Sequence, residues 1–258
     1  MVVRPGRVEV LGCPLDVLDL AGTVERCLDL IEGADGPARQ VSINAAKLIQ
    51  YAEDERLRRF VRDSDVVSAD GQSVVWASGL LGRRLPERVP GIDLMQKLLA
   101  AAAERGLSVY LLGARPRVLH RALDRIRERY PGLHVVGVRN GYFEPREEGE
   151  IADEIREAAP DLLFVAMSSP HKELWLNRYL ARTGARFAMG VGGAIDVLAG
   201  ERTRAPRWMQ RLGLEWAFRL AQEPVRMWRR YLVGNAKFTW LLARELWRRR
   251  RRSQLPAW

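Results

Sequence analysis

Short apolar runs alternate with longer amphipathic stretches from the beginning of the chain to about residue 200. Runs of this length bounded by turn residues predict strands, and apolar residues that recur three or four positions apart predict helices. The predicted strands are Val8–Leu11, Gln40–Ile43, Val66–Val67, Val109–Leu112, His134–Val138, Leu162–Met167 and Phe187–Val191. The predicted helices are Thr23–Glu32, Ala45–Arg62, Ser73–Leu81, Leu94–Arg105, Arg117–Tyr130, about Arg146–Ala159, and one that Ser169 caps with Pro170 at its first position.

This alternation predicts the fold class. Strands and helices that follow each other through short connections favour an α/β, Rossmann-like, mostly parallel sheet with helices on both faces. Leu162–Met167 is nearly all apolar, as expected of a strand that is buried on both sides. After Gly200 the predicted strands end and a basic, helical stretch begins. We therefore divide the chain into a Rossmann-like domain, residues 1–200, and a helical C-terminal appendage, residues 201–258.

Length and composition narrow the class of protein. The 258 residues are 47% hydrophobic and 29% charged, which is enough for one large domain or one domain with an appendage. Cys13 and Cys27 have neither metal-binding nor redox spacing, which favours a reduced, cytosolic protein. The N-terminal Met1 to Gly12 has no apolar segment typical of a signal peptide, and no stretch approaches the ~18 apolar residues of a membrane-spanning helix.

The positive charge is concentrated near the C-terminus. The formal charge of the whole chain is +10, but Arg202–Trp258 holds 15 basic against 3 acidic residues, and the remainder holds 27 against 29. The same stretch contains six of the eight tryptophans. A nearly neutral body with a basic, aromatic tail predicts an anionic partner for the tail, either a membrane surface or nucleic acid.

Polar residues gather immediately after the predicted strands. They are Asn44, Asp70, Tyr142, His171 with Lys172 and Glu173, and Asp196, and Arg88 lies in a loop that can face the same edge. The carboxyl ends of parallel strands lie on one rim of the sheet, where α/β proteins bind their ligands. Each residue taken alone is as consistent with a cap, a turn or a surface position. Their shared location predicts a single cleft.

Several common chemistries have no support in the sequence. Gly113-Ala-Arg-Pro116 is not the GxGxxG turn of a nicotinamide-binding Rossmann protein. Asp63-Ser64-Asp65 matches the short acidic motif with which many sugar transferases hold a metal, but it precedes its strand and therefore lies at the wrong end of the sheet. There is no phosphate-binding P-loop, no GxSxG nucleophile turn and no cluster with metal-ligand spacing.

Eight short motifs in order nevertheless resemble one family, the WecG/TagA/CpsF glycosyltransferases, over about Val8 to Tyr231. The motifs are Ser42-x-Asn44, Ala69-Asp70-Gly71, Arg88-Val-x-Gly91-x-Asp93-Leu94, Gly141-Tyr142-Phe143, Ser169-Pro170-x-x-Glu173-x-Trp175, Gly190-Val-Gly192-Gly193-x-x-Asp196, Arg204-Ala-Pro206-x-Trp208 and Gly213-Leu-Glu215-Trp216-x-x-Arg219-Leu-x-x-Glu223-Pro224-x-Arg226. Any one motif is weak, but the ordered series is specific.

The resemblance implies an inverting, metal-independent transfer of a sugar from a UDP-sugar to an undecaprenyl-diphosphate-linked acceptor, with no cofactor. The sugar expected is N-acetylmannosamine-, uronic acid- or glucose-like, and the setting is cell-surface polysaccharide synthesis at the cytoplasmic face of the membrane. Residues 1–200 are then the catalytic domain and residues 201–258 a membrane-binding appendage.

The resemblance also implies roles for particular residues. Asp70 takes the place of the catalytic base, and Arg88 and Lys172 are assigned to catalysis with it. Tyr142 and Asp196 fall where the nucleotide base is held. The full set assigned to substrate binding is Ser42, Asn44, Gln72, Tyr142, His171, Glu173, Asp196, Arg219, Arg226 and Arg229, of which the three arginines belong to the appendage and are expected to close over the site.

One position departs from the family pattern. Where the family often has Pro-Lys-Gln-Glu, this chain has Pro170-His171-Lys172-Glu173, so that a cation replaces a neutral amide. Lys172 can shift the sugar preference toward a substrate that carries a carboxylate, or it can offset the charge of a diphosphate. The change leaves the donor sugar open without altering the class of reaction.

The chemistry agrees with the residues present. A sugar hydroxyl is a poor nucleophile and needs a base in the transition state, which a carboxylate can supply. Without a metal, arginines and helix N-termini must stabilise the charge that develops on the departing UDP.

Two other interpretations stay open at this point. The basic tail with its tryptophans suits a nucleic-acid-binding protein, although that leaves the polar strand ends unexplained. A non-catalytic scaffold of a polysaccharide assembly would keep the fold alone. We favour the transferase, with an anionic membrane and not nucleic acid as the partner of the tail.

Overall fold

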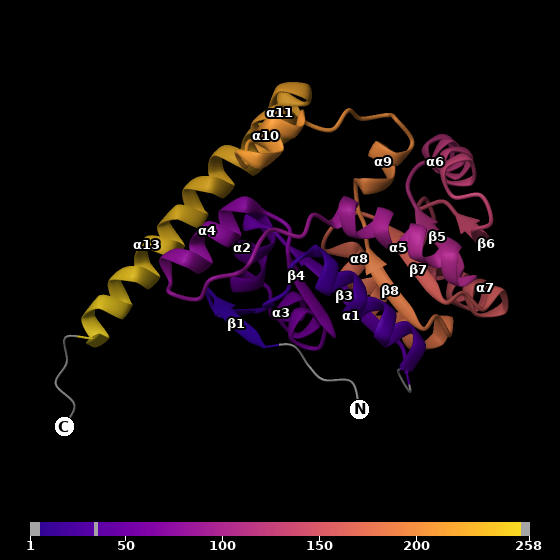
Figure 1. The fold of residues 1–258 in the computed structure, drawn as a ribbon, viewed down its shortest axis with the longest axis horizontal. Coiled ribbons are helices and arrows are strands. Elements are labelled where there is room, and N and C mark those ends of the chain that lie inside the picture. The colour runs from indigo at the N-terminus through magenta and orange to yellow at the C-terminus, as the bar shows by residue number, and fades with distance from the viewer. Residues whose placement is uncertain (1–5, 34–35, 254–258) are drawn as a thin grey trace.

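The computed structural model describes residues 6–33 and 36–253, apart from the side chains of Arg226, Arg230, Arg252 and Ser253. Its centre is a six-stranded sheet in the order β4-β3-β8-β7-β5-β6, in which every pairing is parallel (Figure 1). The strands are β3 Ala38–Ile43, β4 Val66–Ala69, β5 Ser108–Gly113, β6 His134–Arg139, β7 Leu162–Ala166 and β8 Phe187–Gly190. The first two strands along the chain, β1 Arg7–Val10 and β2 Cys13–Asp16, form a separate antiparallel hairpin. The prediction of a parallel sheet is confirmed.

Helices cover both faces of this sheet, as the alternating pattern predicted. One face packs into a buried cluster with α1 Leu20–Gly33, α5 Gly91–Arg105, α6 Pro116–Arg129 and α9 Ala194–Leu198. The other face packs with the hairpin and with α2 Ala45–Glu53, α3 Glu55–Arg62, α4 Gln72–Leu80, α7 Glu148–Ala158 and α8 His171–Thr183. A short 3-10 turn, Pro145–Glu147, precedes α7. Because apolar side chains of each strand point alternately to the two faces, both clusters draw on the same strands.

Two local predictions are wrong. The predicted helix Ala45–Arg62 is two helices, because Asp54 adopts an extended backbone and its carboxylate accepts the Arg56 amide, which starts α3 anew. Ser169 does not cap α8, which begins one residue later than predicted with Pro170 as its N-cap. The Ser169 hydroxyl lies instead 3.4 Å from the side-chain oxygen of Gln50.

The C-terminal appendage is helical throughout the part described here. It consists of α10 Arg207–Arg211, α11 Glu215–Gln222, α12 Pro224–Trp228, a π-helical turn Arg229–Val233 and the long α13 Gly234–Ser253. Helix α13 runs along the edge of the body beside α2 (Figure 1), and Phe238 is buried against the core with Leu241, Leu242 and Leu246 around it. Arg249 donates to the backbone carbonyl of Leu81 at 2.8 Å. The predicted boundary at residue 200 stays a prediction.

Gly113 shows how tightly the sheet is packed at the end that carries the functional residues. It has a φ of +121°, and a Cβ there would lie 2.5 Å from the carbonyl oxygen of Ala166 on the neighbouring strand. That atom belongs to the backbone and accepts a hydrogen bond from the Ala114 amide at 3.0 Å, so it cannot move cheaply. Only glycine fits this approach.

We therefore expect Gly113→Ala to lower the free energy of unfolding by more than the ~1 kcal/mol that a strained backbone alone would cost. The matched control is Gly79→Ala in α4, where a Cβ would meet nothing within 4 Å. Helix propensity predicts that this control gains up to ~1 kcal/mol. Urea unfolding of both variants checks the pair, and equal effects would contradict the packing argument.

Candidate functional site

Asp70 lies at the carboxyl end of β4, one residue past the strand. Its amide donates to the carbonyl of Ile43 on the neighbouring strand at 2.8 Å, which fixes the backbone, and one carboxylate oxygen accepts the amide of Gly91 at 3.3 Å. Burial raises the pKa of the Asp70 carboxyl, and the nearby Glu215 carboxylate adds to this, while the Gly91 hydrogen bond and the Arg88 cation oppose it. A carboxylate in this environment is a better proton acceptor than an exposed one.

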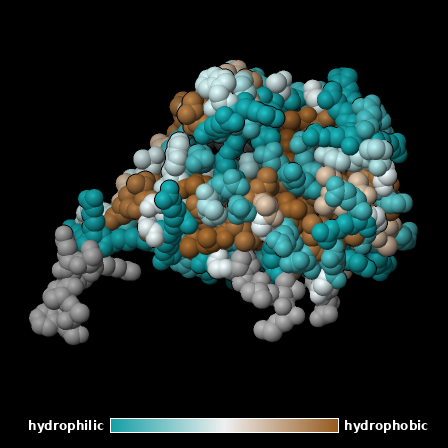
Figure 2. Space-filling view, viewed as in Figure 1, coloured by the Kyte–Doolittle hydropathy of each residue, from teal (hydrophilic) through white to brown (hydrophobic). Residues whose placement is uncertain are grey.

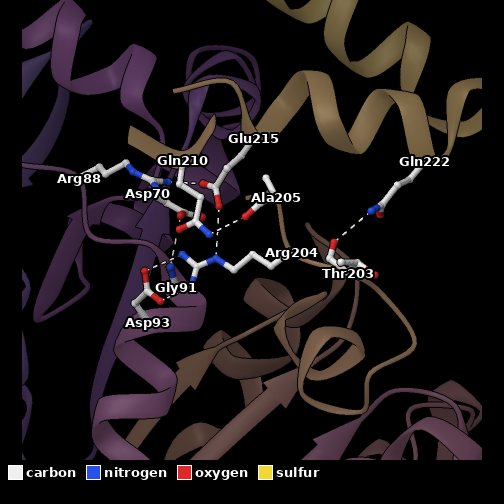
Figure 3. A network of polar contacts seen from close by, with 10 residues as sticks. All are labelled: Asp70, Arg88, Gly91, Asp93, Thr203, Arg204, Ala205, Gln210, Glu215 and Gln222. Atoms are coloured by element: carbon white, nitrogen blue, oxygen red, sulfur yellow. Dashed lines mark hydrogen bonds and ion pairs between the residues drawn. The ribbon is translucent and has the colours of Figure 1, made fainter. Parts of the chain in front are cut away.

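The side chain of Arg88 forms an ion pair with Glu215 at the start of α11 (Figure 3). The other oxygen of Glu215 accepts from Arg204 at 3.3 Å, and Arg204 also forms a two-pronged ion pair with Asp93, of which one contact is 2.7 Å. Arg88 and Asp93 belong to the body, whereas Glu215 belongs to the appendage. The network therefore holds the beginning of α11 next to Asp70.

Arg202 and Arg204, two residues apart in the segment before α10, make matching bridges. Arg202 lies 3.7 Å from the carboxylate of Asp196 in the body and 3.0 Å from that of Glu223 in the appendage. Arg204 joins Asp93 to Glu215 in the same way. Each arginine thus links one carboxylate of the body to one of the appendage, so the two parts are joined by half-buried charge pairs on both sides of the rim.

Arg219 of α11 reaches the turn after β8. A Cβ on Gly193 would lie 2.8 Å from an Arg219 guanidinium nitrogen and 3.5 Å from a carboxylate oxygen of Asp196. The structure therefore brings Arg219 and Asp196 together at Gly193. A glycine here leaves room for the arginine, and any side chain would displace it.

A buried charge cluster lies beneath the rim. Glu173 is 1% exposed and accepts from Lys47 at 2.7 Å and from Lys172 at 3.2 Å. Burial alone would raise the pKa of Glu173, but the two ammonium groups and their hydrogen bonds outweigh it and lower the pKa to about 2. The Lys172 side chain also runs against Gly190, where a Cβ would lie 2.8 Å from its Cε. Lys172 therefore lies beneath the end of β8, in contact with the acid next to it in sequence.

Three smaller polar residues complete the rim near Asp70. Ser42 accepts a hydrogen bond at 3.0 Å from Gln40, whose amide also donates to Ser68 at 2.8 Å. Asn44 caps α2 by accepting the Lys47 amide at 3.0 Å. Gln72 begins α4 and packs beneath Gly213 of the appendage.

Other predicted site residues lie farther out. Tyr142 is 67% exposed, and its hydroxyl accepts from Arg115 at 3.3 Å. His171 is half exposed and lies 3.2 Å from Glu148. Arg229 is exposed and lies over the ring of Trp228, away from the rim. The side chain of Arg226 lies outside the described residues. The structure thus places Arg88 near Asp70 and Arg219 near Asp196, both at the carboxyl rim of the sheet, and Arg229 lies apart from them.

Sequence reasoning did not assign roles to Lys47, Asp93, Arg204 and Glu215. The family motifs include Asp93, Arg204 and Glu215, so the sequence marked these three positions. It did not indicate that their side chains pair with one another. Lys47 carries no such signal, because its partner Glu173 is 126 residues away in the chain.

Two features absent from the described residues bear on the chemistry. No group of three or more His, Cys, Asp or Glu side chains among them is arranged to hold a metal ion. No helix in the described part of the chain is long and apolar enough to cross a membrane. Asp63–Asp65 precedes β4 and so lies at the opposite end of the sheet from Asp70, as predicted.

A carboxylate and arginines lie at the carboxyl rim of a parallel α/β sheet, the place where such folds bind their ligands, and comparison with known proteins gives the class. The model of the glycosyl transferase WecG/TagA/CpsF family matches residues 8–252. The chain belongs to this family, and it is a glycosyltransferase. It is 34% identical over 192 residues, 74% of either chain, to the N-acetylglucosaminyldiphosphoundecaprenol N-acetyl-beta-D-mannosaminyltransferase of Bacillus spizizenii.

The charge cluster beneath the rim generates a prediction. Glu173→Gln leaves two buried ammonium groups without their counterion, and removing one member of a buried ion pair costs about 3–5 kcal/mol. Because the pKa of Glu173 is lowered on folding, its contribution is complete above the ordinary value near 4.5 and is lost as the pH falls toward 2. We expect urea unfolding at pH 7 to show this loss, and the difference from wild type to shrink between about pH 4.5 and pH 2.

Lys172→Gln is the matched control, because it restores the amide common in the family and leaves the 2.7 Å pair between Lys47 and Glu173 intact. It should cost clearly less stability than Glu173→Gln. A cost as large would show that Lys47 alone does not hold Glu173.

Proposed function

We propose that the protein transfers a sugar, with inversion and without a metal, from a UDP-sugar to an undecaprenyl-diphosphate-linked saccharide in the synthesis of a cell-surface polymer. The observation that carries the proposal is the position of Asp70, a carboxylate with a raised pKa at the rim, where Arg88 of the body lies near it and Arg219 of the appendage reaches the turn after β8. The mannosaminyl transfer named for the Bacillus relative supports a lipid-diphosphate acceptor.

Asp70 acts as the general base in this proposal. The acceptor hydroxyl loses its proton as it attacks the anomeric carbon, and the Asp70 carboxylate takes that proton. The Gly91 amide holds the carboxylate by one oxygen and leaves the other oxygen for the proton. Attack from the face opposite to the departing UDP inverts the anomeric centre.

Arginines stabilise the departing diphosphate. Arg219 lies at the turn after β8 and Arg88 lies next to Asp70, and a guanidinium matches phosphate oxygens in pairs. Glu215 occupies the guanidinium of Arg88 in the structure, so a bound diphosphate competes with that carboxylate for it. Lys172, buried beneath the same end of the sheet, adds positive charge near the donor site.

The tail places the enzyme at an anionic bilayer, on the cytoplasmic face of the membrane. Trp240, Arg244, Trp247 and Arg251 recur at helical spacing along α13, with Arg244 and Arg251 stacked on the two exposed indoles. Figure 2 shows hydrophobic side chains along the middle of α13 and hydrophilic ones near its end. Paired tryptophans and arginines suit a helix that lies among lipid headgroups.

The identity of the donor sugar and the role of the basic tail each have alternatives that experiments can distinguish. The donor sugar is N-acetylmannosamine-, uronic acid- or glucose-like, and Lys172 is the residue that can distinguish them. A nucleic-acid-binding protein would explain the basic tail, but membership of a glycosyltransferase family and the polar rim favour the enzyme.

The test is turnover of a panel of UDP-sugars with a lipid-diphosphate-linked N-acetylglucosamine acceptor. Asp70→Asn keeps the shape of the side chain and can still accept the hydrogen bond from the Gly91 amide, but it removes the group that takes up the proton. We therefore expect kcat to fall by about 10²–10⁴-fold while donor binding changes little. Near-normal turnover by the folded variant would remove Asp70 from the mechanism. A chelator should not reduce the wild-type rate, and a strict need for a divalent metal would contradict the metal-independent step.

The pH dependence provides a control for this variant. Burial raises the pKa of Asp70, so kcat of the wild type should increase with pH around a pKa above the ordinary value of 3.8. The pH profile of Asp70→Asn should lack this increase. A carboxyl whose pKa is raised on folding loses its contribution to stability as the pH rises through the folded pKa. The ionised Asp70 therefore lowers stability at neutral pH, and the Tm of Asp70→Asn should be no lower than that of wild type.

Deletion of residues 248–258 tests the tail. Near an anionic leaflet each cation contributes ~1 kcal/mol, within a Debye length of ~8 Å at physiological salt. The deletion should weaken salt-sensitive binding to anionic vesicles but spare turnover of a water-soluble acceptor analogue. Arg219→Ala should lower turnover even with that analogue. Full vesicle binding by the shortened protein would show that the tail does not hold the membrane.

A further inference from the structure

Helix α4 exposes two large apolar side chains although it belongs to the body. Trp76 is 56% and Leu80 63% exposed, and they stand four residues apart on one edge of the helix. The opposite edge is buried in the core through Val74 and Ala77. Helix α4 is thus apolar on both edges, whereas a helix at a water-facing surface is normally polar on its outer edge.

The appendage contacts α4 at both ends without covering this edge. At the beginning, a Cβ on Gly213 would lie 2.8 Å from Gln72 and 3.3 Å from the ring of Trp76. At the end, Arg249 of α13 donates to the carbonyl of Leu81 at 2.8 Å. Figure 1 shows α4 beside α13, with α10 and α11 near the other end of α13. The exposed edge of α4 therefore adjoins the appendage helices.

The neighbouring helix α10 has the same character. It exposes Trp208 and Leu212 next to the exposed Arg207 and Arg211. Neither residues 72–86 nor residues 207–214 contain an aspartate or a glutamate, and Arg84 is exposed just after α4. Apolar side chains beside cations complement the surface of an anionic bilayer, and an acidic side chain near the end of α4, that of Glu9, pairs with Arg83 at 3.6 Å.

The position of α4 in the chain links this edge to the chemistry. Asp70 and Gly71 directly precede the helix, and Trp76 lies four residues past its first residue, which is about 6 Å along the axis. An anchor at Trp76 therefore fixes the height of Asp70 above whatever surface α4 touches. A diphosphate carried by a membrane lipid has its height fixed by the bilayer in the same way.

We propose that the exposed edge of α4, formed by Trp76 and Leu80, is a second membrane-contact element that inserts into the interface of an anionic bilayer and sets Asp70 at the level of the lipid-borne diphosphate. The proposal rests on the proposed function for its lipid-linked acceptor, but the contact itself does not need turnover. The α4 contact and the tail bind the membrane through different interactions. The tail binds mainly through its positive charge, whereas α4 binds by inserting apolar side chains.

The experiment measures sedimentation of the full chain with vesicles of phosphatidylglycerol and phosphatidylethanolamine at low and at high salt. Trp76→Gln with Leu80→Gln should weaken the vesicle affinity about tenfold or more at both salt concentrations, since two apolar side chains no longer leave water. Deletion of residues 248–258 should act mainly at low salt. The matched control is Val136→Gln, which changes a residue that is 42% exposed on β6, the edge strand opposite β4.

A conservative pair separates insertion from folding. Trp76→Phe with Leu80→Met keeps the edge apolar and should retain vesicle binding. If this pair lost binding as fully as the glutamine pair, or if the glutamine pair bound vesicles like wild type, α4 would not be a membrane contact. A change of oligomeric state in size-exclusion chromatography without a change in vesicle binding would assign the edge to a protein partner and overturn the proposal.

Turnover distinguishes this proposal from the proposed function. With a vesicle-embedded acceptor the glutamine pair should be slower than wild type, and with a water-soluble acceptor analogue the two should be equal. If no UDP-sugar were turned over by the wild type while the glutamine pair still lost vesicle binding, the proposed function would fail and the membrane contact would stand.

Discussion

The ion pairs between the body and the appendage are the constraint on which the site depends. Arg202 and Arg204 each join a carboxylate of the body to a carboxylate of the appendage, and Arg88 adds a third link through Glu215. These charges are half-buried, so water screens them less than it would at an open surface. They lie between the body and the same helix, α11, that carries Arg219 to Gly193.

In the proposed function, the same pairs compete with the substrate for an arginine. Arg88, which a diphosphate can use in the proposed function, is already engaged by the Glu215 carboxylate, which offsets its charge before a substrate is bound. A bound diphosphate then exchanges one anionic partner for another and does not bring a new charge into an empty cationic pocket. If the proposed function holds, binding of the donor and the position of α11 are coupled through Glu215.

Buried charge beneath the rim has a different role. Glu173 lies between Lys47 on α2 and Lys172 on its own helix, and so it ties together two helices that follow different strands. A buried ion pair adds little net stability compared with apolar packing, but it makes one arrangement of the helices better than the others. Lys172 is thereby held beneath the end of β8, where the family more often has a neutral amide.

The hydrophobic pattern by itself determined the parallel sheet, the two helical faces and the place of Asp70, Asn44 and Asp196 at the strand ends. It did so because strand and helix periods are local, and because parallel strands carry all their carboxyl ends to one rim. At Asp54 the carboxylate accepts a backbone amide and starts a new helix, so the hydrophobic pattern predicted one helix where the structure has α2 and α3. Only the tertiary structure decided that Arg88 meets Glu215, 127 residues later, that Lys47 meets Glu173, and that Trp76 and Leu80 stay uncovered. These outcomes depend on how finished elements pack against each other, and no window along the sequence contains both partners.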